Sequence, residues 1–192
     1  LISAINGDQA AIYSQCSNTL IDNSFVFGNL KNGILLHTAG ANGSIVRNTV
    51  VGRSPLGVEQ GNGWNGVFAW QANNVTVENS TIVNNGGGTV GTTMPDRISG
   101  IRYQQVTSGT INNNYIGTDA AKTLAGNNFD GITLHTNASN VQVTNNVITN
   151  NGLNSVYGAG GGLAIREASN GNLVRSNFIG VHRDSTAGRN ND

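Results

Sequence analysis

The sequence predicts an all-β solenoid in which about six rungs of short strands stack on one another. A rung here is one circuit of the chain around the solenoid. Two patterns support this fold class: a small residue followed by apolar residues recurs six times, and two further apolar columns follow each recurrence at nearly constant spacing. Composition is the third observation, because 27 glycines and 31 asparagines in 192 residues supply the turns that short strands need.

The first strand of each rung is expected at the recurring small residue. It is followed by an apolar, a variable and an apolar position at 10–13, 33–36, 66–69, 100–103, 131–134 and 162–165. Side chains alternate between the two faces of a strand. Ile132 and Leu134 should therefore face the core, and Thr133 and His135 should face outward. The apolar stretches are too short for amphipathic helices.

Two later strands in each rung are expected at apolar columns that lie five residues apart. The first of these columns holds Ile21, Ile45, Val77, Ile111, Val143 and Val174, and the second holds Val26, Val50, Ile82, Ile116, Ile148 and Ile179. Between them lies a polar column of Ser24, Asn48, Ser80, Asn114, Asn146 and Asn177. Stacked rungs place like on like, so the asparagine amides should bond along the stack as an asparagine ladder.

Composition excludes several partner classes. The formal net charge is zero, which argues against nucleic acid and anionic membranes as partners. The single cysteine, Cys16, cannot form an intrachain disulfide, and no His/Cys cluster predicts a metal site. We expect no cofactor. No apolar run is long enough for a transmembrane helix.

One phrase occurs twice, as NYIGTDAAKTLAGNN (114–128) and as NFIGVHRDSTAGRNN (177–191). With the repeats, it resembles secreted bacterial proteins with the right-handed parallel β-helix of the pectin-lyase-like superfamily. The resemblance covers essentially the whole chain and implies one β-helix domain over residues 1–192, secreted or at the cell surface. We expect this domain to be part of a longer solenoid or a unit that stacks end to end. The superfamily includes lyases, hydrolases, epimerases, tailspikes and adhesins, so the fold alone does not indicate the function.

The outward positions of the first strands form a stripe that suits a sugar polymer. Aromatic rings can stack on sugar faces, while Arg, Gln and His reach hydroxyls or carboxylates. The candidate binding residues are His37, Phe68, Trp70, Arg102, Gln104 and Arg166, with Trp64 from the segment before the third first-strand. A solvated face with chance aromatics is the alternative interpretation.

The candidate catalytic residues are His135, Asp130, Asp96 and Glu167. His135 would act as base and Asp130 or Asp96 as acid, because the three acids fall on successive rungs. Asp130 is more simply a turn-capping acceptor, since Asn and Ser occupy its equivalent positions. Neither the clustered acids of pectate lyases nor the Asp-Pro-His of mannuronan epimerases occurs here.

Three functions therefore remain open. The first is a secreted or surface-displayed β-helix that binds a polysaccharide along its first-strand face. The second is a polysaccharide lyase, glycoside hydrolase or epimerase that acts in the same groove. The third is a structural solenoid without a ligand that assembles with itself end to end.

Overall fold

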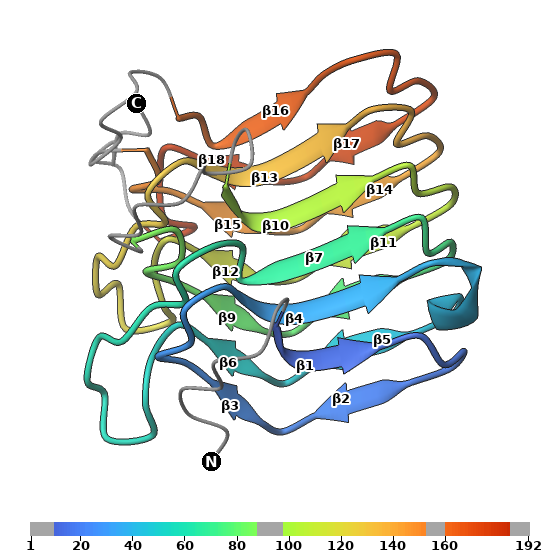
Figure 1. The fold of residues 1–192 in the computed structure, drawn as a ribbon. Coiled ribbons are helices and arrows are strands. Elements are labelled where there is room, and N and C mark those ends of the chain that lie inside the picture. The colour runs from blue at the N-terminus through green and yellow to red at the C-terminus, as the bar shows by residue number, and fades with distance from the viewer. Residues whose placement is uncertain (1–9, 88–97, 153–159, 185–192) are drawn as a thin grey trace.

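The computed structural model describes residues 10–87, 98–152 and 160–184. The chain winds into three parallel sheets, and each sheet contains six strands (Figure 1). Successive strands along the chain enter different sheets, so each strand pairs with its equivalent one rung away. This arrangement confirms the predicted all-β parallel solenoid.

The strand bounds follow the repeat. The first sheet contains β1 (Ala10–Ser14), β4 (Asn32–His37), β7 (Val67–Trp70), β10 (Ser99–Gln104), β13 (Asp130–His135) and β16 (Leu163–Ile165). The second contains β2 (Leu20–Asp22), β5 (Ile45–Arg47), β8 (Thr76–Glu78), β11 (Thr110–Asn112), β14 (Gln142–Thr144) and β17 (Leu173–Arg175). The third contains β3 (Phe25–Val26), β6 (Val50–Val51), β9 (Thr81–Ile82), β12 (Tyr115–Ile116), β15 (Val147–Ile148) and β18 (Phe178–Ile179).

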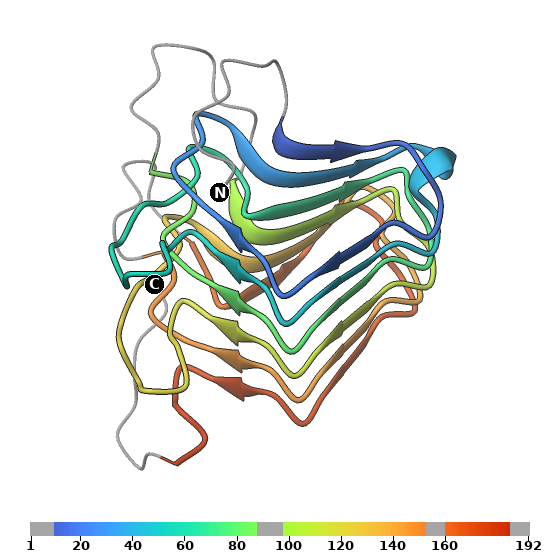
Figure 2. The same ribbon diagram turned by 90° about the horizontal axis from the view of Figure 1, so that it is seen from below.

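The core lies between the three sheets, which surround it when the molecule is seen along the stack (Figure 2). Each central rung contributes inward side chains from all three sheets; Ile101, Ile111 and Ile116 do so in one rung and are fully buried. A single rung could not bury these side chains, so stacking supplies the hydrophobic stabilisation. The one helical element in the described ranges is the short 3-10 turn η1 (Ala39–Ala41), and no helix there could cross a membrane.

The rungs are not equivalent, and the prediction of about six rungs is corrected to four full turns with an incomplete one at each end. Four turns of the solenoid, those of β4 to β15, have a paired neighbour on both sides. The strand sets β1–β3 and β16–β18 pair on one side only. As a result Ile165, Val174 and Ile179 are 44%, 41% and 46% exposed, although their columns are fully buried in the four enclosed turns.

The register differs from the predicted columns in the first two rungs. Ile12 pairs with Ile34, so the first rung lies one residue later than its small-residue motif suggested. In the second rung Val46 and Val51 occupy the apolar columns, in place of Ile45 and Val50. Because the 3-10 turn η1 lengthens the corner before β5, the spacing from the first strand is changed there.

Asparagine forms two ladders inside the corners. The predicted ladder is confirmed from Ser80 onward: Asn114 Nδ2 donates to Asn146 Oδ1 at 2.9 Å, and Asn146 Nδ2 donates to Asn177 Oδ1 at 3.0 Å. Thr49, rather than Asn48, lies beside Ser80 in this column. Asn48 directly precedes Thr49 in the same turn between β5 and β6, where it adopts a positive φ of 50°.

A second ladder was not predicted. It lies at the corner between the third and first sheets and contains Asn29, Asn62, Asn85, Asn127 and Asn151. The side-chain amide of each of the first four donates to the side-chain oxygen of the next member over 2.7 to 2.9 Å. Buried amides in water-excluded corners need such partners, so the ladder binds successive rungs together.

Candidate functional site

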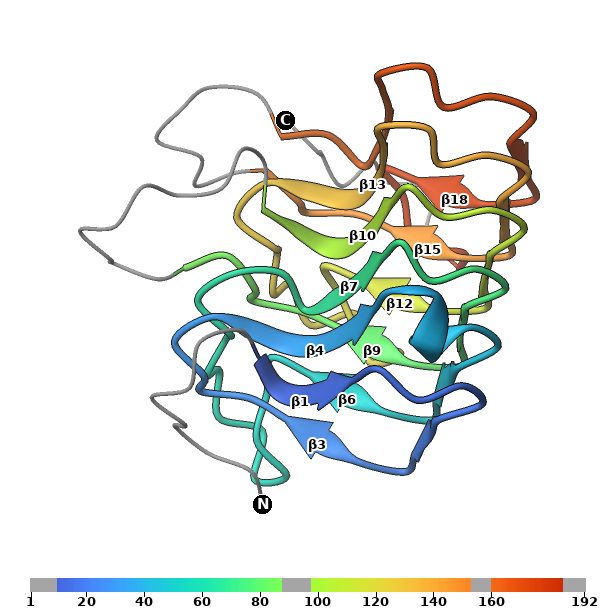
Figure 3. The ribbon, with the colours of Figure 1, turned by 45° about the vertical axis from the view of Figure 1, so that its right-hand side comes forward.

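The outer face of the first sheet brings most of the predicted site residues together. In register across the sheet lie Tyr13, Leu35, Phe68, Arg102, Thr133 and Ala164. One pleat further along, His37 pairs with Trp70, Trp70 with Gln104 and Gln104 with His135. Figure 3 shows the strands that carry these residues one above another.

One half of this face is aromatic. The His37 and Trp70 rings stack with centroids 4.4 Å apart, and the Tyr13 hydroxyl lies 3.1 Å from His37 Nδ1. Trp70 Nε1 donates to Gln105 Oε1 at 3.2 Å, which fixes the indole orientation. Phe68 lies parallel to Trp70, with centroids 5.9 Å apart. We call Tyr13, His37, Phe68 and Trp70 the aromatic row.

Arg102 lies between the aromatic row and the charged half of the face, which contains Asp130, His135, Arg166 and Glu167. Its guanidinium carbon lies 5.5 Å from the Phe68 ring centroid, a cation–π contact. Arg102 is only 6% exposed. His37 covers one face of the Trp70 ring, and Arg102 covers one face of the Phe68 ring. A ligand bound to the aromatic row would therefore contact the uncovered faces of these rings, their edges and the neighbouring polar groups.

Asp130 begins the charged half and is held by several donors. Thr133 Oγ1 donates to its Oδ2 at 2.7 Å, and the Gly161 N–H donates to its Oδ1 at 2.8 Å. Arg166 Nη2 lies 3.3 Å from Oδ2. The carboxylate is almost completely buried. These contacts match those of a capping acceptor at the start of a strand.

His135 lies at the other end of the same strand from Asp130. Its Nε2 lies 3.2 Å from Glu167 Oε1, and its Nδ1 lies 2.6 Å from the Thr136 hydroxyl. Although this position faces the outer side, His135 is only 7% exposed and Thr133 is fully buried. This part of the sheet is therefore not the solvated face of the alternative interpretation.

The other predicted residues lie apart from this face or outside the described residues. Trp64 precedes β7; its backbone N–H donates to the Lys31 carbonyl at 3.0 Å, and Lys31 Nζ lies 5.1 Å from its ring centroid. Asp96 lies outside the described residues. In the part of the chain that the structure describes, no group of three His, Cys, Asp or Glu side chains could hold a metal ion.

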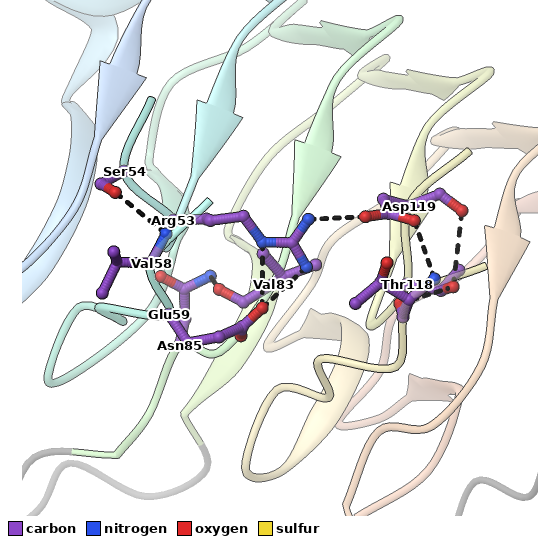
Figure 4. Close-up of polar contacts among 9 residues, drawn as sticks. Arg53, Ser54, Val58, Glu59, Val83, Asn85, Thr118 and Asp119 are labelled. Carbon is purple, nitrogen blue, oxygen red and sulfur yellow. Dashed lines mark hydrogen bonds and ion pairs between the residues drawn. The ribbon is translucent and has the colours of Figure 1, made fainter. Parts of the chain in front are cut away.

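Two hairpins beside the third sheet are joined by a partly buried ion pair (Figure 4). Arg53, in the hairpin after β6, contacts Glu59 at 2.8 Å and Asp119, in the hairpin after β12, at 2.6 Å. Burial opposes the ionisation of Asp119, but hydrogen bonds from Arg53 and Thr123 outweigh it and hold the pKa of Asp119 below its ordinary value of 3.8. The pair bridges over the intervening rung of β9.

Tyr13, Gln105 and Thr136 take part in the site but were missed by the sequence analysis. Tyr13 was missed because the first rung was aligned one residue early. Gln105 and Thr136 follow directly after the stripe positions Gln104 and His135. A correct register for the first rung would have predicted Tyr13. Gln105 and Thr136 occupy equivalent turn positions, but their residue types differ from rung to rung, so the sequence does not mark them as part of the site.

The sequence profile for the right-handed β-helix region matches residues 2–179. The chain belongs to this family. No curated protein matches the chain.

Several solved structures share this β-helix. The A-module of the mannuronan C-5 epimerase AlgE4 from Azotobacter vinelandii has a TM-score of 0.62 at 16% identity, covering 87% of this chain and 42% of that one. The A-module of AlgE6 from the same organism has a TM-score of 0.59 at 20% identity, with coverages of 90% and 45%. The periplasmic alginate epimerase AlgG has a TM-score of 0.67 at 13% identity, with coverages of 92% and 37%. The chain thus spans less than half of each of these proteins, and the likeness shows the fold.

Proposed function

We propose that this β-helix binds a polysaccharide along the outer face of its first sheet and that it is secreted or displayed at the cell surface. The observation that carries the proposal is the aromatic row, which runs over β1, β4 and β7 and continues into Arg102 on β10. An extended polymer lying along the stack would meet this row rung after rung.

The residue types of the row support a carbohydrate ligand. Aromatic side chains offer apolar surface to sugar C–H groups, and their polar tips offer hydrogen bonds. His37 and Trp70 are partly exposed, and so is Gln104 on the next rung. The solved structures with this fold include enzymes named for mannuronan and alginate, which supports a polymer of sugars as the ligand class. The periplasmic location in the name of one of them supports a position outside the cytoplasm.

The hydrogen bonding favours binding over catalysis. A general acid or base must reach the reacting group of the substrate. Asp130 is 1% exposed and accepts bonds from Thr133 and the Gly161 N–H. Both ring nitrogens of His135 have close neighbours within the protein. The groups best suited to proton transfer are thus engaged in holding the sheet.

Affinity gel electrophoresis with neutral and acidic polysaccharides, alginate among them, tests the proposal. We expect retention by at least one polymer and a loss of about tenfold or more in affinity for Trp70→Ala, because one aromatic contact is worth about 1 to 3 kcal/mol. Phe25→Ala is the matched control, since Phe25 is a partly exposed aromatic residue on the third sheet. Equal losses in both variants, or no retention by any polymer, would contradict the proposal.

A lyase, hydrolase or epimerase acting at the same face is the second candidate. It is favoured by two ion pairs at opposite ends of β13, His135 with Glu167 and Asp130 with Arg166. Mass spectrometry of polymers incubated with the protein in deuterated water distinguishes the two. Cleaved or deuterium-labelled products that disappear in His135→Ala would establish the enzyme, and unchanged polymer supports the binding protein.

A further inference from the structure

The dipeptide His-Thr closes two strands of the first sheet. His37 ends β4 and is followed by Thr38, and His135 ends β13 and is followed by Thr136. Both threonines have positive φ, 65° and 44°. A β-branched residue adopts this conformation only when its surroundings hold it there. The two sites therefore share a positive φ at the residue after the strand, and Thr38, with a ψ of 172°, also begins the 3-10 turn η1.

Their side-chain contacts differ. The Thr38 hydroxyl donates to the His37 carbonyl at 2.6 Å. The Thr136 hydroxyl instead donates to Glu167 Oε2 at 2.9 Å and lies 2.6 Å from His135 Nδ1. Glu167 Oε1 completes the set at 3.2 Å from His135 Nε2. We call His135, Thr136 and Glu167 the clasp.

The three contacts of the clasp require three protons. Thr136 has one hydroxyl proton, and the bond to Glu167 uses it. His135 Nδ1 must then carry a proton to donate to the Thr136 oxygen. A bare Nε2 would direct its lone pair at the Glu167 oxygen, so this nitrogen needs a proton as well. The closed clasp therefore contains an imidazolium paired with a carboxylate.

Removing one proton must open one contact. If His135 keeps only its Nε2 proton, the Thr136 hydroxyl turns to donate to Nδ1, and its oxygen then faces Glu167 Oε2 with no proton between them. If His135 keeps only its Nδ1 proton, the Nε2 lone pair faces the carboxylate. In either case Glu167 loses one of its two contacts.

Other charged groups lie around His135. Arg166 lies beside it on the last rung and contacts Asp130, and Arg102 lies on β10, two residues before the Gln104 that pairs with His135. Asp130 offsets Arg166, and the Glu167 carboxylate contacts the His135 ring itself. The Glu167 side chain is 61% exposed.

The clasp joins the last rung to the rung before it. The backbone N–H of Asn137 donates to the Glu167 carbonyl at 2.9 Å. Glu167 and Ala168 both have positive φ, 51° and 58°, so this turn depends on its contacts to keep its shape. We propose that the clasp depends on protonation. It holds the turn after β16 against β13 when His135 is charged, and it releases this turn when His135 is neutral.

Amide hydrogen exchange of Asn137, measured by NMR from pH 5.5 to 8.5 and corrected for intrinsic exchange, tests this proposal. We expect its protection to fall by about tenfold or more as the pH rises, since a hydrogen bond to a charged group is worth about 1.5 to 3 kcal/mol. Ser108 is the reference amide, because it donates to the Ser139 carbonyl at 2.9 Å in the corresponding turn one rung earlier. Protection of Asn137 that stays constant relative to Ser108 would overturn the proposal.

Variants separate the clasp from the general effect of pH. Glu167→Gln should abolish the pH dependence, because an amide can both donate to a neutral ring nitrogen and accept from Thr136. Thr136→Val should do the same, while Thr38→Val at the equivalent turn should leave it intact. Since Glu167 is exposed, its variant is expected to fold even if the Thr136 variant does not. A pH dependence that persists in Glu167→Gln would overturn the proposal.

Discussion

Arg53 and Asp119 lie 66 residues apart in the sequence, yet their side chains meet at 2.6 Å. The contact joins two hairpins on alternate rungs and passes over the rung between them. The rungs are therefore held together outside the sheets as well as within them.

The first prediction concerns acid stability. The pKa of Asp119 is lowered in the folded protein, so its contribution is present above the unfolded value and is lost as the pH falls through the folded value. We expect Asp119→Asn to lower the free energy of unfolding by about 1 to 2 kcal/mol at pH 7. As the pH falls below the ordinary value of 3.8, the difference from the parent protein should shrink. Urea unfolding at pH 7, 5 and 3 measures it, and an equal difference at all three pH values would contradict the ion pair.

The second prediction concerns the second asparagine ladder, at the corner between the third and first sheets. Asn127 Oδ1 accepts from the backbone N–H and the Nδ2 of Asn85, and its own Nδ2 donates to Asn151. Asn127→Ala leaves these buried groups unpaired, so we expect a loss of about 3 kcal/mol or more in the free energy of unfolding. Asn128→Ala is the control, because Asn128 is only half-buried and outside the ladder. Chemical denaturation compares the two, and similar small losses would argue against the ladder.

The third prediction concerns Tyr103, the one aromatic side chain among the fully buried core residues of the described ranges. The Tyr103 hydroxyl donates to the carbonyls of Val75 and Thr110, at 3.0 and 3.2 Å. A Cβ on Gly109 would lie 2.4 Å from Tyr103 Cε2. We expect Gly109→Ala to cost about 1 to 3 kcal/mol through overpacking.

Two comparisons check that clash. Gly87→Ala, where a Cβ finds no neighbour closer than 3.6 Å among the described residues, should be nearly neutral. In a Tyr103→Leu background the Gly109→Ala cost should fall, because the ring edge is gone. Thermal unfolding that shows the same cost in both backgrounds would indicate a different cause.

The sequence predicted the sheets well because stacked rungs repeat their apolar spacing. In each rung the counterparts of Ile111, Asn114 and Ile116 keep the same spacing from one another. Residues that stack in one column must all be apolar or all be able to share hydrogen bonds. Register was lost where a corner changes length, as at η1 before β5. The second ladder could not be predicted, because its members follow one another at separations of 33, 23, 42 and 24 residues through loops of different length.

The site was predicted only in outline, for a related reason. Alternation places Arg102 and His135 on the outer face, but it does not indicate that both are almost completely buried. Likewise, the contact of Glu167 with Thr136 depends on how two turns with positive φ direct their side chains. Neither property leaves a periodic trace in the sequence.

The most direct test of polysaccharide binding at this face uses the indole N–H signals of the two tryptophans. They are recorded by NMR while a polymer retained in the affinity gel is added, and Trp70→Phe assigns the Trp70 signal. Because Trp70 Nε1 is held by Gln105 beside His37, a polymer on the aromatic row should shift this signal in proportion to occupancy. An unchanged Trp70 signal at saturation, or the failure of every polymer to bind, would contradict the proposed function.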